Sequence, residues 1–368
     1  VYLPKLEANT DDRSDPSDFM PRGAGGLYLQ YHYIVNNPNS VDEKDLLDDA
    51  EDGSEYSRSH REFHPVLRDF AREFGFYDVF LINGSGQVVY TVTKEVDFGT
   101  NVLYPPFDES NLGEVFREVQ QSSLSGDVKL VDFAPYAPSF GEPASFMAAP
   151  ILDGGWLLGA LVFQMTVGEI DRVMTNGRNW QIDGLGTTGE TFIVGPDLLM
   201  RSNSRMALED PEGFLVDAVE SGMSEADVRL IEKHRTTILI QEVSTPAVTA
   251  ALAGETATEI AFDYRNIEVL TSYAPLDIEG VDWAVLAEMN ADEAFARIRT
   301  FTRNLVLGLA GLLGVFLVGA WVLARRFVEP IVGLEESARR FAAGEREVEV
   351  PVTSHDEIGR LAAGFNEM

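Results

Sequence analysis

Two histidines stand four residues apart in the segment HREFH, a spacing that places both on one face of a helix. His60 and His64 could therefore ligate zinc, or serve a hydrolase together with nearby carboxylates. The zinc-protease motif needs a glutamate where this chain has Arg61, and no third ligand is evident. We expect an ordinary helix-surface or packing role for both histidines, with no metal and no catalytic residue.

The acidic segment DDAEDGS resembles part of a calcium-binding loop. Asp48, Asp52 and Gly53 would fall on the first, fifth and sixth positions of such a loop. The third and twelfth positions would be Ala50 and Ser59, which cannot supply the carboxylates that calcium needs. We interpret the segment as a solvated loop.

The segment GLGTTG has the glycine spacing of a dinucleotide-binding loop, with Gly184, Gly186 and Gly189. Such a loop joins a strand to a helix whose N-terminus meets the pyrophosphate. Here residues 190–194 have the composition of a strand, so we interpret the segment as a tight turn and expect no cofactor. Phosphate loops, nucleophile elbows and zinc motifs are also missing, so we expect no enzymatic activity within this sequence.

Composition narrows the possible partners. The chain has 368 residues, enough for two domains and a membrane segment, and 45% of them are hydrophobic. Its net charge of -32 repels nucleic acid, so we expect no nucleic-acid partner. The absence of cysteine from the sequence excludes disulfides, thiolate metal sites and cysteine nucleophiles.

Leu305–Ala324 is a run of twenty residues without a charged or strongly polar side chain. At about 1.5 Å per residue, a helix of this length reaches about 30 Å, the thickness of the hydrocarbon layer of a bilayer. Arg303 and Arg325 flank the run, and Trp321 lies where interfacial aromatic residues gather. The run predicts one transmembrane helix in a lipid bilayer.

After this span, apolar residues recur at spacings of three and four, the pattern of a helix that packs against a partner helix. The two sets are Ile331, Leu334, Ala338, Phe341 and Ile358, Leu361, Phe365, Met368. Pro330 suits the start of the first helix, Gly344 its end, and Asp356 with Glu357 the start of the second. Because neither seam can bury itself alone, we expect a parallel bundle of two helices from each of two chains.

The sequence before residue 300 alternates helix and strand patterns twice. A helix is predicted from Pro65 to Gly75 and another at residues 111–121. The five strands of the first half are expected at residues 78–82, 87–93, 128–134, 144–152 and 156–165. In the second half we expect a hairpin at 191–194 and 198–202, a helix at 225–234, and strands at 259–262, 268–274 and 283–289. The fold class is therefore α+β with antiparallel sheets.

The two halves also share sequence near their ends. Ala149-Pro150-Ile151 leads to Gln164-Met165, and Ala274-Pro275-Leu276 leads to Glu288-Met289. With the repeated strand order, this match favours an internal duplication.

Two parts of the sequence resemble known families. Residues 327–368 resemble a HAMP linker, through Pro330 and the sequence DEIGRL with the later FN-x-M. Residues 27–300 are similar to a double Cache sensor, in the phrases YDVFLINGSGQVVYTVTKEVDFGT, PASFMAAPI, GLGTTGETFIVGPDLLMRSNSR and LTSYAPLDIEGVDWAVLAEMN. Together they imply tandem PAS-like Cache units, one transmembrane helix and a HAMP helical bundle, as in bacterial chemoreceptors, sensor kinases and receptor-type nucleotide cyclases.

The expected domains follow from both resemblances. They are a lead-in at residues 1–64, a membrane-distal Cache unit at 65–175, a membrane-proximal unit at 176–290, a juxtamembrane helix at 291–304, the span at 305–324 and HAMP at 325–368. The chain opens at Val1 without an initiator methionine, so we expect that a membrane anchor precedes it. We also expect that an output domain follows Met368.

The resemblance implies a small-molecule site in the membrane-distal unit, between the sheet and its covering loops. The corresponding stretch offers Asp132, Tyr136, Ser139 and Phe146 as an acceptor, a phenol, a hydroxyl and an aromatic wall. The alternative is that these residues only pack strand ends and cap loops. The Arg and Trp cluster of amino-acid-binding Cache domains is not visible there, so the ligand stays an unknown small organic molecule.

The resemblance further implies a receptor in the plasma (inner) membrane, a parallel homodimer with the sensor extracytoplasmic and HAMP in the cytoplasm. Asn290 and Glu293 are spaced as a capping box, and nothing breaks a helix from residue 291 to 326, so we expect one continuous rod. It would carry a ligand-induced displacement into HAMP. The relay residues are expected to be Pro330, Ile331, Leu334, Phe341, Glu357, Ile358, Leu361 and Phe365.

Two other functions remain open at this stage. One is a membrane-anchored extracytoplasmic hydrolase that uses His60 or His64. The other is a protein-interaction module without a small ligand.

Overall fold

The computed structural model describes residues 19–124, 126–180, 182 and 184–368, so residues 1–18 of the predicted lead-in lie outside the described part. The described residues divide into two compact units, one that ends at Ala294 and a second at Phe295–Met368. The first unit holds two antiparallel sheets with helices, which confirms the predicted α+β class.

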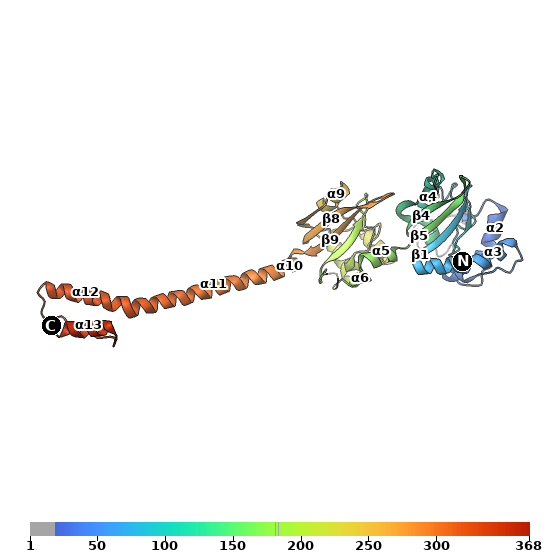
Figure 1. Cartoon of the computed structure of the whole chain (residues 1–368). Helices are drawn as coiled ribbons and strands as arrows, with labels where there is room; N and C mark the ends of the chain where they lie inside the picture. Colours follow the sequence, from blue (N-terminus) through green and yellow to red (C-terminus); the bar gives the residue numbers. More distant parts are fainter. Residues whose placement is uncertain (1–18, 125, 181, 183) are drawn as a thin grey trace. The chain divides into compact units, whose positions relative to one another are not determined.

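The first module (residues 19–165) is built on a five-stranded antiparallel sheet of order β2-β1-β5-β4-β3, labelled in Figure 1. Its strands are β1 (Phe76–Asn83), β2 (Val88–Tyr90), β3 (Lys129–Tyr136), β4 (Glu142–Asp153) and β5 (Trp156–Met165). Its helical segments are α2 (Ala24–Gln30), the π-helical η2 (Tyr31–Val35), the 3-10 segments η3 (Val41–Leu46) and η4 (Ala137–Ser139), α3 (Glu55–Phe74) and α4 (Asn111–Gln120).

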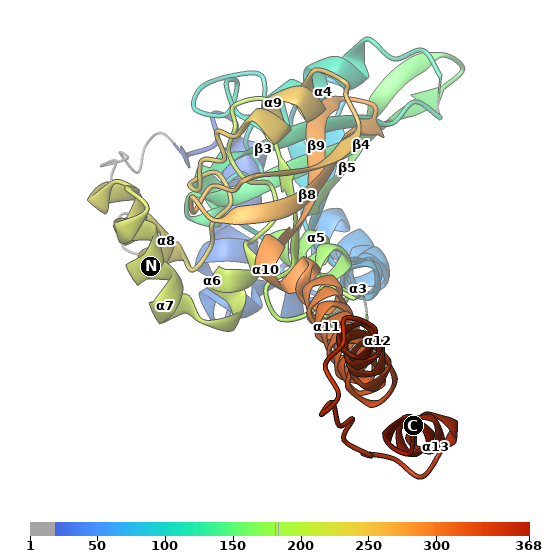
Figure 2. The ribbon, with the colours of Figure 1, turned by 90° about the vertical axis from the view of Figure 1, so that its left-hand side faces the viewer.

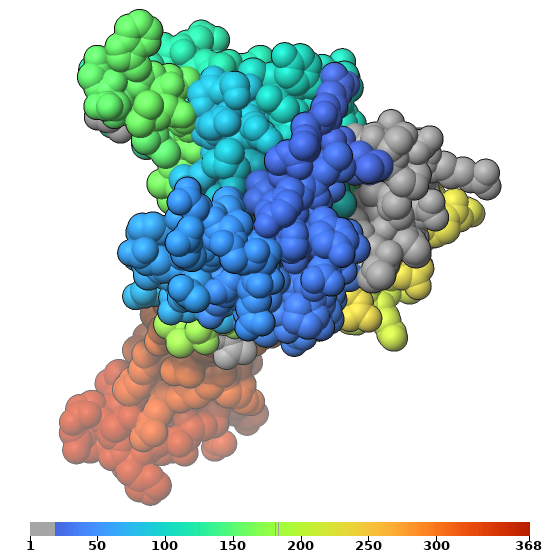
Figure 3. Space-filling view, turned by 90° about the vertical axis from the view of Figure 1, so that its right-hand side faces the viewer, coloured from blue at the N-terminus to red at the C-terminus, as the bar shows by residue number. Residues whose placement is uncertain are grey.

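Helix α4 covers one face of this sheet, and its apolar side forms a core with the strands. Leu112, Phe116, Phe80 and Phe146 are fully buried there. In the space-filling view of Figure 3, the described N-terminal residues, in blue, cover the centre and lower part of the face toward the viewer.

Helix α3 begins ten residues before the predicted start at Pro65. The hydroxyl of Ser54 accepts a hydrogen bond from the backbone N–H of Ser57 at 3.0 Å and caps the helix at Glu55. An internal proline costs a helix about 3 kcal/mol, and the buried face of α3 offsets this cost by packing. The predicted end at Gly75 is confirmed, since Gly75 adopts the left-handed conformation with φ 73°.

The second module (residues 167–290) holds a four-stranded antiparallel sheet of order β6-β9-β8-β7. Its strands are β6 (Glu190–Val194), β7 (Ala257–Phe262), β8 (Glu268–Ile278) and β9 (Val281–Asn290), and its helices are α5 (Val167–Met174), α6 (Arg205–Glu209), α7 (Pro211–Glu220), α8 (Glu225–His234) and α9 (Pro246–Leu252). Helix α9 lies on the sheet, while α6, α7 and α8 gather beside it (Figure 2). Helix α8 has the predicted bounds.

The strand predicted at residues 198–202 is not formed. This segment makes only isolated bridges, from Met200 to Val194 and from Leu199 to Glu242. Leu198 has a positive φ of 66°, which turns the chain out of the extended conformation that a hairpin strand requires. The second sheet therefore has four strands where the sequence predicted five.

The two sheets share one strand order, apart from the extra strand β2. In each, the first strand pairs with the last, and the last with the one before it. The matching prolines also occupy equivalent places, since Pro150 pairs with Ala160 and Pro275 with Ala284 of the final strand. This arrangement agrees with the predicted duplication.

The second unit is almost entirely helical. It contains α11 (Ala296–Leu323), the π-helical η5 (Ala324–Val328), α12 (Glu329–Ala342) and α13 (Glu357–Asn366). The helical run Ala296–Ala342 has a window of mean hydropathy 2.4, long and apolar enough to cross a membrane. Pro330 lies in the first turn of α12, as predicted, and Asp356 caps α13 by accepting from Ile358 N at 3.0 Å and Gly359 N at 3.2 Å.

The predicted uninterrupted rod from residue 291 to 326 is wrong. Helix α10 spans only Ala291–Ala294, and Phe295 then leaves helical geometry with φ −98° and ψ 2° before α11 begins. The membrane helix instead continues past residue 326, because η5 joins α11 to α12 without a break.

The predicted capping box of Asn290 and Glu293 is also wrong. The Glu293 carboxylate accepts from the backbone N–H and the hydroxyl of Thr187 at 2.9 and 3.0 Å, and from those of Thr188 at 2.9 and 2.6 Å. Asn290 N–H in turn donates to the Thr188 hydroxyl at 3.2 Å. Helix α10 is therefore clamped to the turn before β6.

Glu293→Gln should loosen this clamp. Hydrogen bonds from the Thr188 hydroxyl and the Thr187 backbone lower the pKa of Glu293 to about 2. Their stabilisation is thus present above the ordinary carboxyl pKa and disappears as the pH falls towards 2. We expect faster amide exchange at Thr187 and Thr188 in the variant near neutral pH, and a smaller loss of stability on acidification below about pH 5 than in the parent chain. Glu255→Gln on the exposed surface is the matched control; equal exchange in both variants would contradict the clamp.

Candidate functional site

A buried polar network lies inside the first module. We call it the acidic cluster and define it as the carboxylates Asp78, Glu95 and Asp97 with the polar side chains Tyr77, Tyr136, Ser139 and Gln164. Strands β1, β3 and β5 supply Tyr77 with Asp78, Tyr136 and Gln164, η4 supplies Ser139, and the loop after β2 supplies Glu95 and Asp97. The three carboxylates expose at most 4% of their surface.

Hydroxyl groups hold two of the carboxylates. Tyr136 donates to Asp97 Oδ2 at 2.6 Å, and Ser139 donates to Glu95 Oε2 at 2.8 Å. Tyr77 donates to Glu95 Oε1 at 2.7 Å. The Gln164 amide donates to the Ser139 hydroxyl at 3.0 Å, so residues from β1, β3, β5 and η4 meet in one network.

Asp78 has its own partners. Its Oδ1 accepts from the backbone N–H groups of Val92 at 2.6 Å and Thr93 at 3.2 Å, and its Oδ2 accepts from the Thr93 hydroxyl. The positive charge of Lys94 favours the ionised form of Asp78. The Lys94 ammonium donates to the Thr91 carbonyl and lies 4.5 Å from the ring centroid of Tyr90.

Burial dominates the electrostatics of the cluster. It raises the pKa of Asp97 to about 7, with a further contribution from Asp78, and raises the pKa of Glu95 well above its usual value, with a contribution from Asp97. Burial also raises the pKa of Asp78 to about 6 and lowers the pKa of Lys94 to about 7. The cluster therefore concentrates negative charge that desolvation opposes.

Two acceptors in this network have no hydrogen-bond partner within the described residues. They are Asp97 Oδ1 and Gln164 Oε1, both nearly inaccessible to solvent. A buried acceptor without a donor costs about 1–3 kcal/mol, so each of these two atoms is costly in the folded chain.

The four residues expected to bind a ligand do not all meet. Tyr136 and Ser139 belong to the acidic cluster, and Phe146 is buried behind them with its ring centroid 5.0 Å from that of Tyr136. Asp132 lies elsewhere, because a bulge in β3 between Val131 and Ala134 reverses the alternation of its side chains. Whether the first three bind a ligand stays a prediction.

Asp132 instead joins the two modules. Its carboxylate accepts from Arg201 through Nε and Nη2 at 2.8 and 2.9 Å, and from Trp283 Nε1 at 2.9 Å. Phe133 stacks on Trp283 at 6.0 Å between ring centroids. Gly280 approaches the Leu130 carbonyl so closely that a Cβ would lie 2.3 Å from its oxygen, and its φ of 97° also favours glycine. We call these contacts the module junction.

Sequence reasoning missed Glu95, Asp97 and Gln164. The available signal was three charged residues, Lys94, Glu95 and Asp97, within four positions, since such a density of charge is unusual in a segment that folds into a core. Gln164 carried no comparable signal, because one polar residue in an apolar strand has many explanations.

The paired histidines are packed inside the first module. Their ring centroids are 4.2 Å apart, and His64 contacts the Tyr90 hydroxyl and the Asp45 carbonyl, each at 2.7 Å. Burial lowers the pKa of His60 to about 3 and that of His64 to about 2. The expected packing role is confirmed. Within the described residues, no group of three histidines or carboxylates has the geometry of a metal site.

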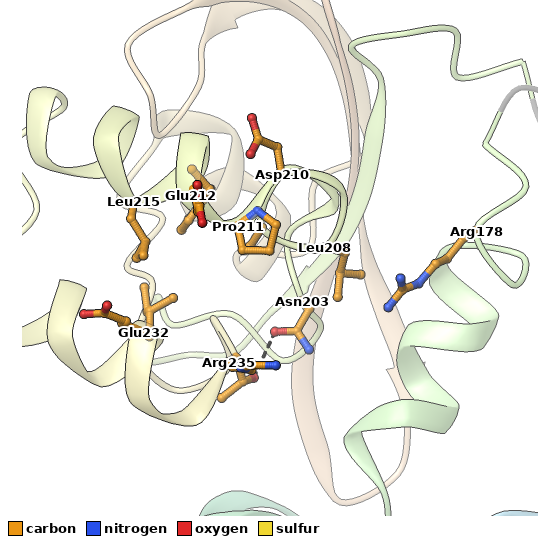
Figure 4. A pocket seen from close by; sticks show the side chains of 13 residues that line it. Arg178, Asn203, Leu208, Asp210, Pro211, Glu212, Leu215, Glu232 and Arg235 are labelled. Carbon is orange, nitrogen blue, oxygen red and sulfur yellow. Dashed lines mark hydrogen bonds between the residues drawn. The ribbon is translucent and has the colours of Figure 1, made fainter.

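A separate pocket of about 610 Å³ lies in the second module (Figure 4). Arg178, Asp210, Glu232 and Arg235 are among its lining residues. Asn203, at its floor, already binds Asp171 and Thr236. The Asn203 amide is thus satisfied by the protein itself, unlike the two unpartnered acceptors of the acidic cluster.

Comparisons with known proteins bear on both units. Residues 322–368 match the HAMP domain family. The methyl-accepting chemotaxis protein TlpQ of Pseudomonas aeruginosa is 24% identical over 247 residues, which are 63% of this chain and 31% of that protein. The alginate biosynthesis sensor protein KinB of Pseudomonas aeruginosa is 37% identical over 98 residues, which are 25% of this chain and 16% of that protein.

Solved structures similar to this chain include the ligand-binding domain of the Pseudomonas fluorescens chemoreceptor CtaA in complex with L-serine. The match covers 73% of this chain and 97% of that domain, with 12% sequence identity and a TM-score of 0.39. The ligand-binding domain of the Pseudomonas aeruginosa chemoreceptor PctB with L-Arg has 15% identity and the same TM-score of 0.39, covering 74% and 91%. Similarity at this level carries no information about a ligand.

The chain spans less than a third of the length of TlpQ, 31%, and 16% of that of KinB. Two sheet modules precede a helix able to cross a membrane, and the HAMP match begins within that helix. Residues 322–368 therefore form a HAMP domain, and the chain has the sensory and membrane-linked organisation of a transmembrane signalling protein.

Proposed function

We propose that the first unit is an extracytoplasmic sensor that binds a small ligand at the acidic cluster of its first module. The signal passes through the module junction, strand β9 and helix α10 into the membrane helix, and HAMP delivers it to a cytoplasmic output domain of the cyclase, kinase or methyl-accepting kind. The protein lies in the plasma membrane as a parallel homodimer.

The module junction is the observation that carries this proposal. A bidentate pair between carboxylate and guanidinium fixes both distance and orientation, unlike a contact between apolar side chains. The Arg201 side chain is buried, whereas the Asp132 side chain is 29% exposed, so the pair is only partly shielded from water. Strand β3 cannot shift by more than a fraction of an ångström without moving Arg201 or Trp283 or breaking these bonds.

The junction connects a strand that reaches the acidic cluster with a strand that leads to α10. Strand β3 carries Asp132 in its middle and Tyr136 of the acidic cluster at its end. Trp283 lies near the start of β9, and β9 ends at Asn290, where α10 begins. A change at the cluster thus reaches α10 through two strands, and the Glu293 clamp couples α10 to the second module.

Exposed apolar side chains support a second copy of the chain. On α3, Phe63, Val66, Phe70 and Phe74 form an exposed stripe on one side of the helix. In the HAMP domain, Leu334, Ile358 and Phe365 pack within the chain, whereas Ile331 and Leu361 are exposed by 54% and 64%. A parallel partner would bury both sets, with Phe341, Pro330 and Glu357 at the bundle's ends and edges.

Membrane orientation follows from the HAMP domain. HAMP domains resembling this one work in the cytoplasm, so the sheet modules belong on the other side of the bilayer. A hydrolase using His60 or His64 is disfavoured, because both rings are buried and held by protein partners.

Asp132→Asn tests the relay. The variant removes the charge that the first module offers to Arg201, while Asp197 still accepts from Arg201 Nη2 at 2.9 Å and prevents an unpaired buried charge. We expect amide exchange in β9 and α10 of the full chain in nanodiscs to rise about tenfold, since a hydrogen bond to a charged group contributes about 1.5–3 kcal/mol. Exchange in β1 and β5 should stay unchanged.

Asp197→Asn is the matched control. It removes the same charge beside the same arginine but lies within the second module, so the junction survives. If both variants change β9 equally, or neither does, the junction does not couple the modules.

Single cysteines test the dimer. The sequence contains no cysteine, so Phe63→Cys and Phe70→Cys each introduce one reactive thiol on the apolar stripe of α3. Mild oxidation in membranes should link these chains in pairs, because the stripe faces its copy across the two-fold axis. Arg58→Cys points away from the stripe and should stay largely monomeric. Equal linking at all three positions would indicate random collision.

A further inference from the structure

The pocket in the second module is a second binding site, separate from the acidic cluster. We propose that it binds a small organic anion, whose carboxylate is held by Arg178 and Arg235 and whose apolar body lies against the apolar side chains of the pocket. This inference goes beyond the sensor function proposed above and does not require a ligand at the acidic cluster.

The cavity has the size and the lining of a small-molecule site. Its volume is about 610 Å³, and such sites commonly measure about 300–1,000 Å³. Helices α6, α7 and α8 and the loop after α5 line it. Its apolar side chains are Ala207, Leu208, Pro211, Phe214, Leu215 and Ile231. Phe214 and Ile231 also belong to a buried core, so packing holds this apolar surface in place.

Both arginines occupy backbone positions at which glycine is favoured. The φ angle is 69° at Arg178 and 51° at Arg235, in the left-handed region that side chains with a Cβ rarely adopt. Arg235 is the C-cap of α8, a position that glycine commonly takes. Strained residues of this kind gather at binding sites, which indicates a role for the two guanidinium groups.

Neither guanidinium group is neutralised by a nearby carboxylate. Among the described residues, the side chains of Arg178 and Arg235 have no ion pair, whereas Arg229 on α8 pairs with Glu225 at 3.4 Å. Arg178 acts only at longer range, where its charge favours the ionised form of Asp171. In a chain with 60 acidic and 28 basic residues, two unpaired arginines in one pocket mark a site for an anion from outside.

The charges of the pocket lie on different sides. In Figure 4, the Arg178 side chain reaches into the pocket from one side, and Glu212 and Glu232 lie on the other. The third carboxylate, Asp210, caps α7 by accepting from the backbone N–H of Gly213 at 3.0 Å. A carboxylate matches the planar fork of a guanidinium group, whereas an organic cation would leave both arginines unpaired.

A bound anion would act on the segment that carries the module junction. Asn203 lines the pocket and lies two residues after Arg201. Its backbone N–H and its amide donate to the Asp171 carboxylate of α5 at 2.7 and 2.6 Å. An anion held by both Arg178 and Arg235 would therefore connect the loop after α5 with the end of α8 around this segment.

Six-carbon probes of different charge test the inference on the full chain in nanodiscs, with empty nanodiscs subtracted. The probes share one chain length, so their apolar contribution is the same and only the head group differs. By isothermal titration calorimetry, hexanoate should bind, and 1-hexanol and hexylamine should bind at least about tenfold more weakly. Hexylamine or 1-hexanol binding as tightly as hexanoate would overturn the inference.

Amide exchange locates the bound probe. Hexanoate should slow exchange at residues 176–178 and 231–236, and it should leave residues 94–97 of the acidic cluster unchanged. Protection at the acidic cluster without protection at the pocket would mean that the anion binds elsewhere.

Paired substitutions give the decisive comparison. Arg178→Asn and Arg235→Asn should each weaken hexanoate binding about tenfold or more, while the melting temperature stays equal or rises, because asparagine tolerates the left-handed conformation better than arginine. Lysine at either position keeps the charge but loses the fork, so binding should be intermediate. These lysine variants decide the matter if an asparagine variant does not fold.

Two further variants serve as controls. Arg229→Gln removes an arginine from α8 that does not line the pocket, and it should bind hexanoate like the parent chain. Glu232→Gln removes a negative charge from the pocket and should bind hexanoate equally well or more tightly. Unchanged binding in both asparagine variants, or lost binding in Arg229→Gln, would refute the site.

If hexanoate does not bind at tens of millimolar, the two arginines are merely solvated and the inference fails. That result leaves the relay untouched, because Asp132→Asn and Asp197→Asn judge the module junction without any ligand.

Discussion

The pairing of Asp132 with Arg201 is the interaction on which the arrangement of the two sheet modules depends. The Asp132 carboxylate accepts two hydrogen bonds from the guanidinium and one from the indole N–H of Trp283, and the surrounding contacts are apolar. A bidentate pair fixes the orientation of its partners as well as their distance, which apolar packing alone does not do. The pair therefore ties the two sheets together within one compact unit.

Buried acids are an expensive way to fill a protein core. Replacing Glu95 and Asp97 by apolar residues of similar size would remove their desolvation cost, and stability alone would favour that change. Proteins tend to break such rules where function demands it. The first module keeps its charged residues beside an otherwise well-packed core of Phe80, Phe146 and Phe116.

The sequence was sufficient to predict features that depend on a long, repeated pattern. The helix able to cross a membrane, the HAMP domain, the two antiparallel sheets and the Asp356 cap are confirmed because each follows from periodicity, from a sequence motif or from local hydrogen bonds. The failures share a different origin. A bulge in β3 moved Asp132 to the other face, and a positive φ at Leu198 prevented a strand. Neither is visible in a pattern of apolar residues.

Tertiary competition accounts for the remaining errors. Glu293 satisfies a capping pattern in the sequence, but Thr187 and Thr188 offer it four donors from more than a hundred residues away. Pro65 looks like a helix start, but Ser54 caps the helix earlier. Glu95 and Asp97 join Gln164 only because the loop after β2 folds under the sheet, and such a meeting depends on the complete fold.

The π-helical segment Ala324–Val328 sets the rotation of α12 about the helix axis relative to α11. A π turn holds about one residue more than an α turn, and each residue of an α-helix advances the azimuth by about 100°. Annealing this turn into regular α-helix would swing Leu334 around the helix axis by roughly that angle, with an axial step of only about 1.5 Å. The helix that follows the membrane span could therefore rotate about its axis as well as shift along it.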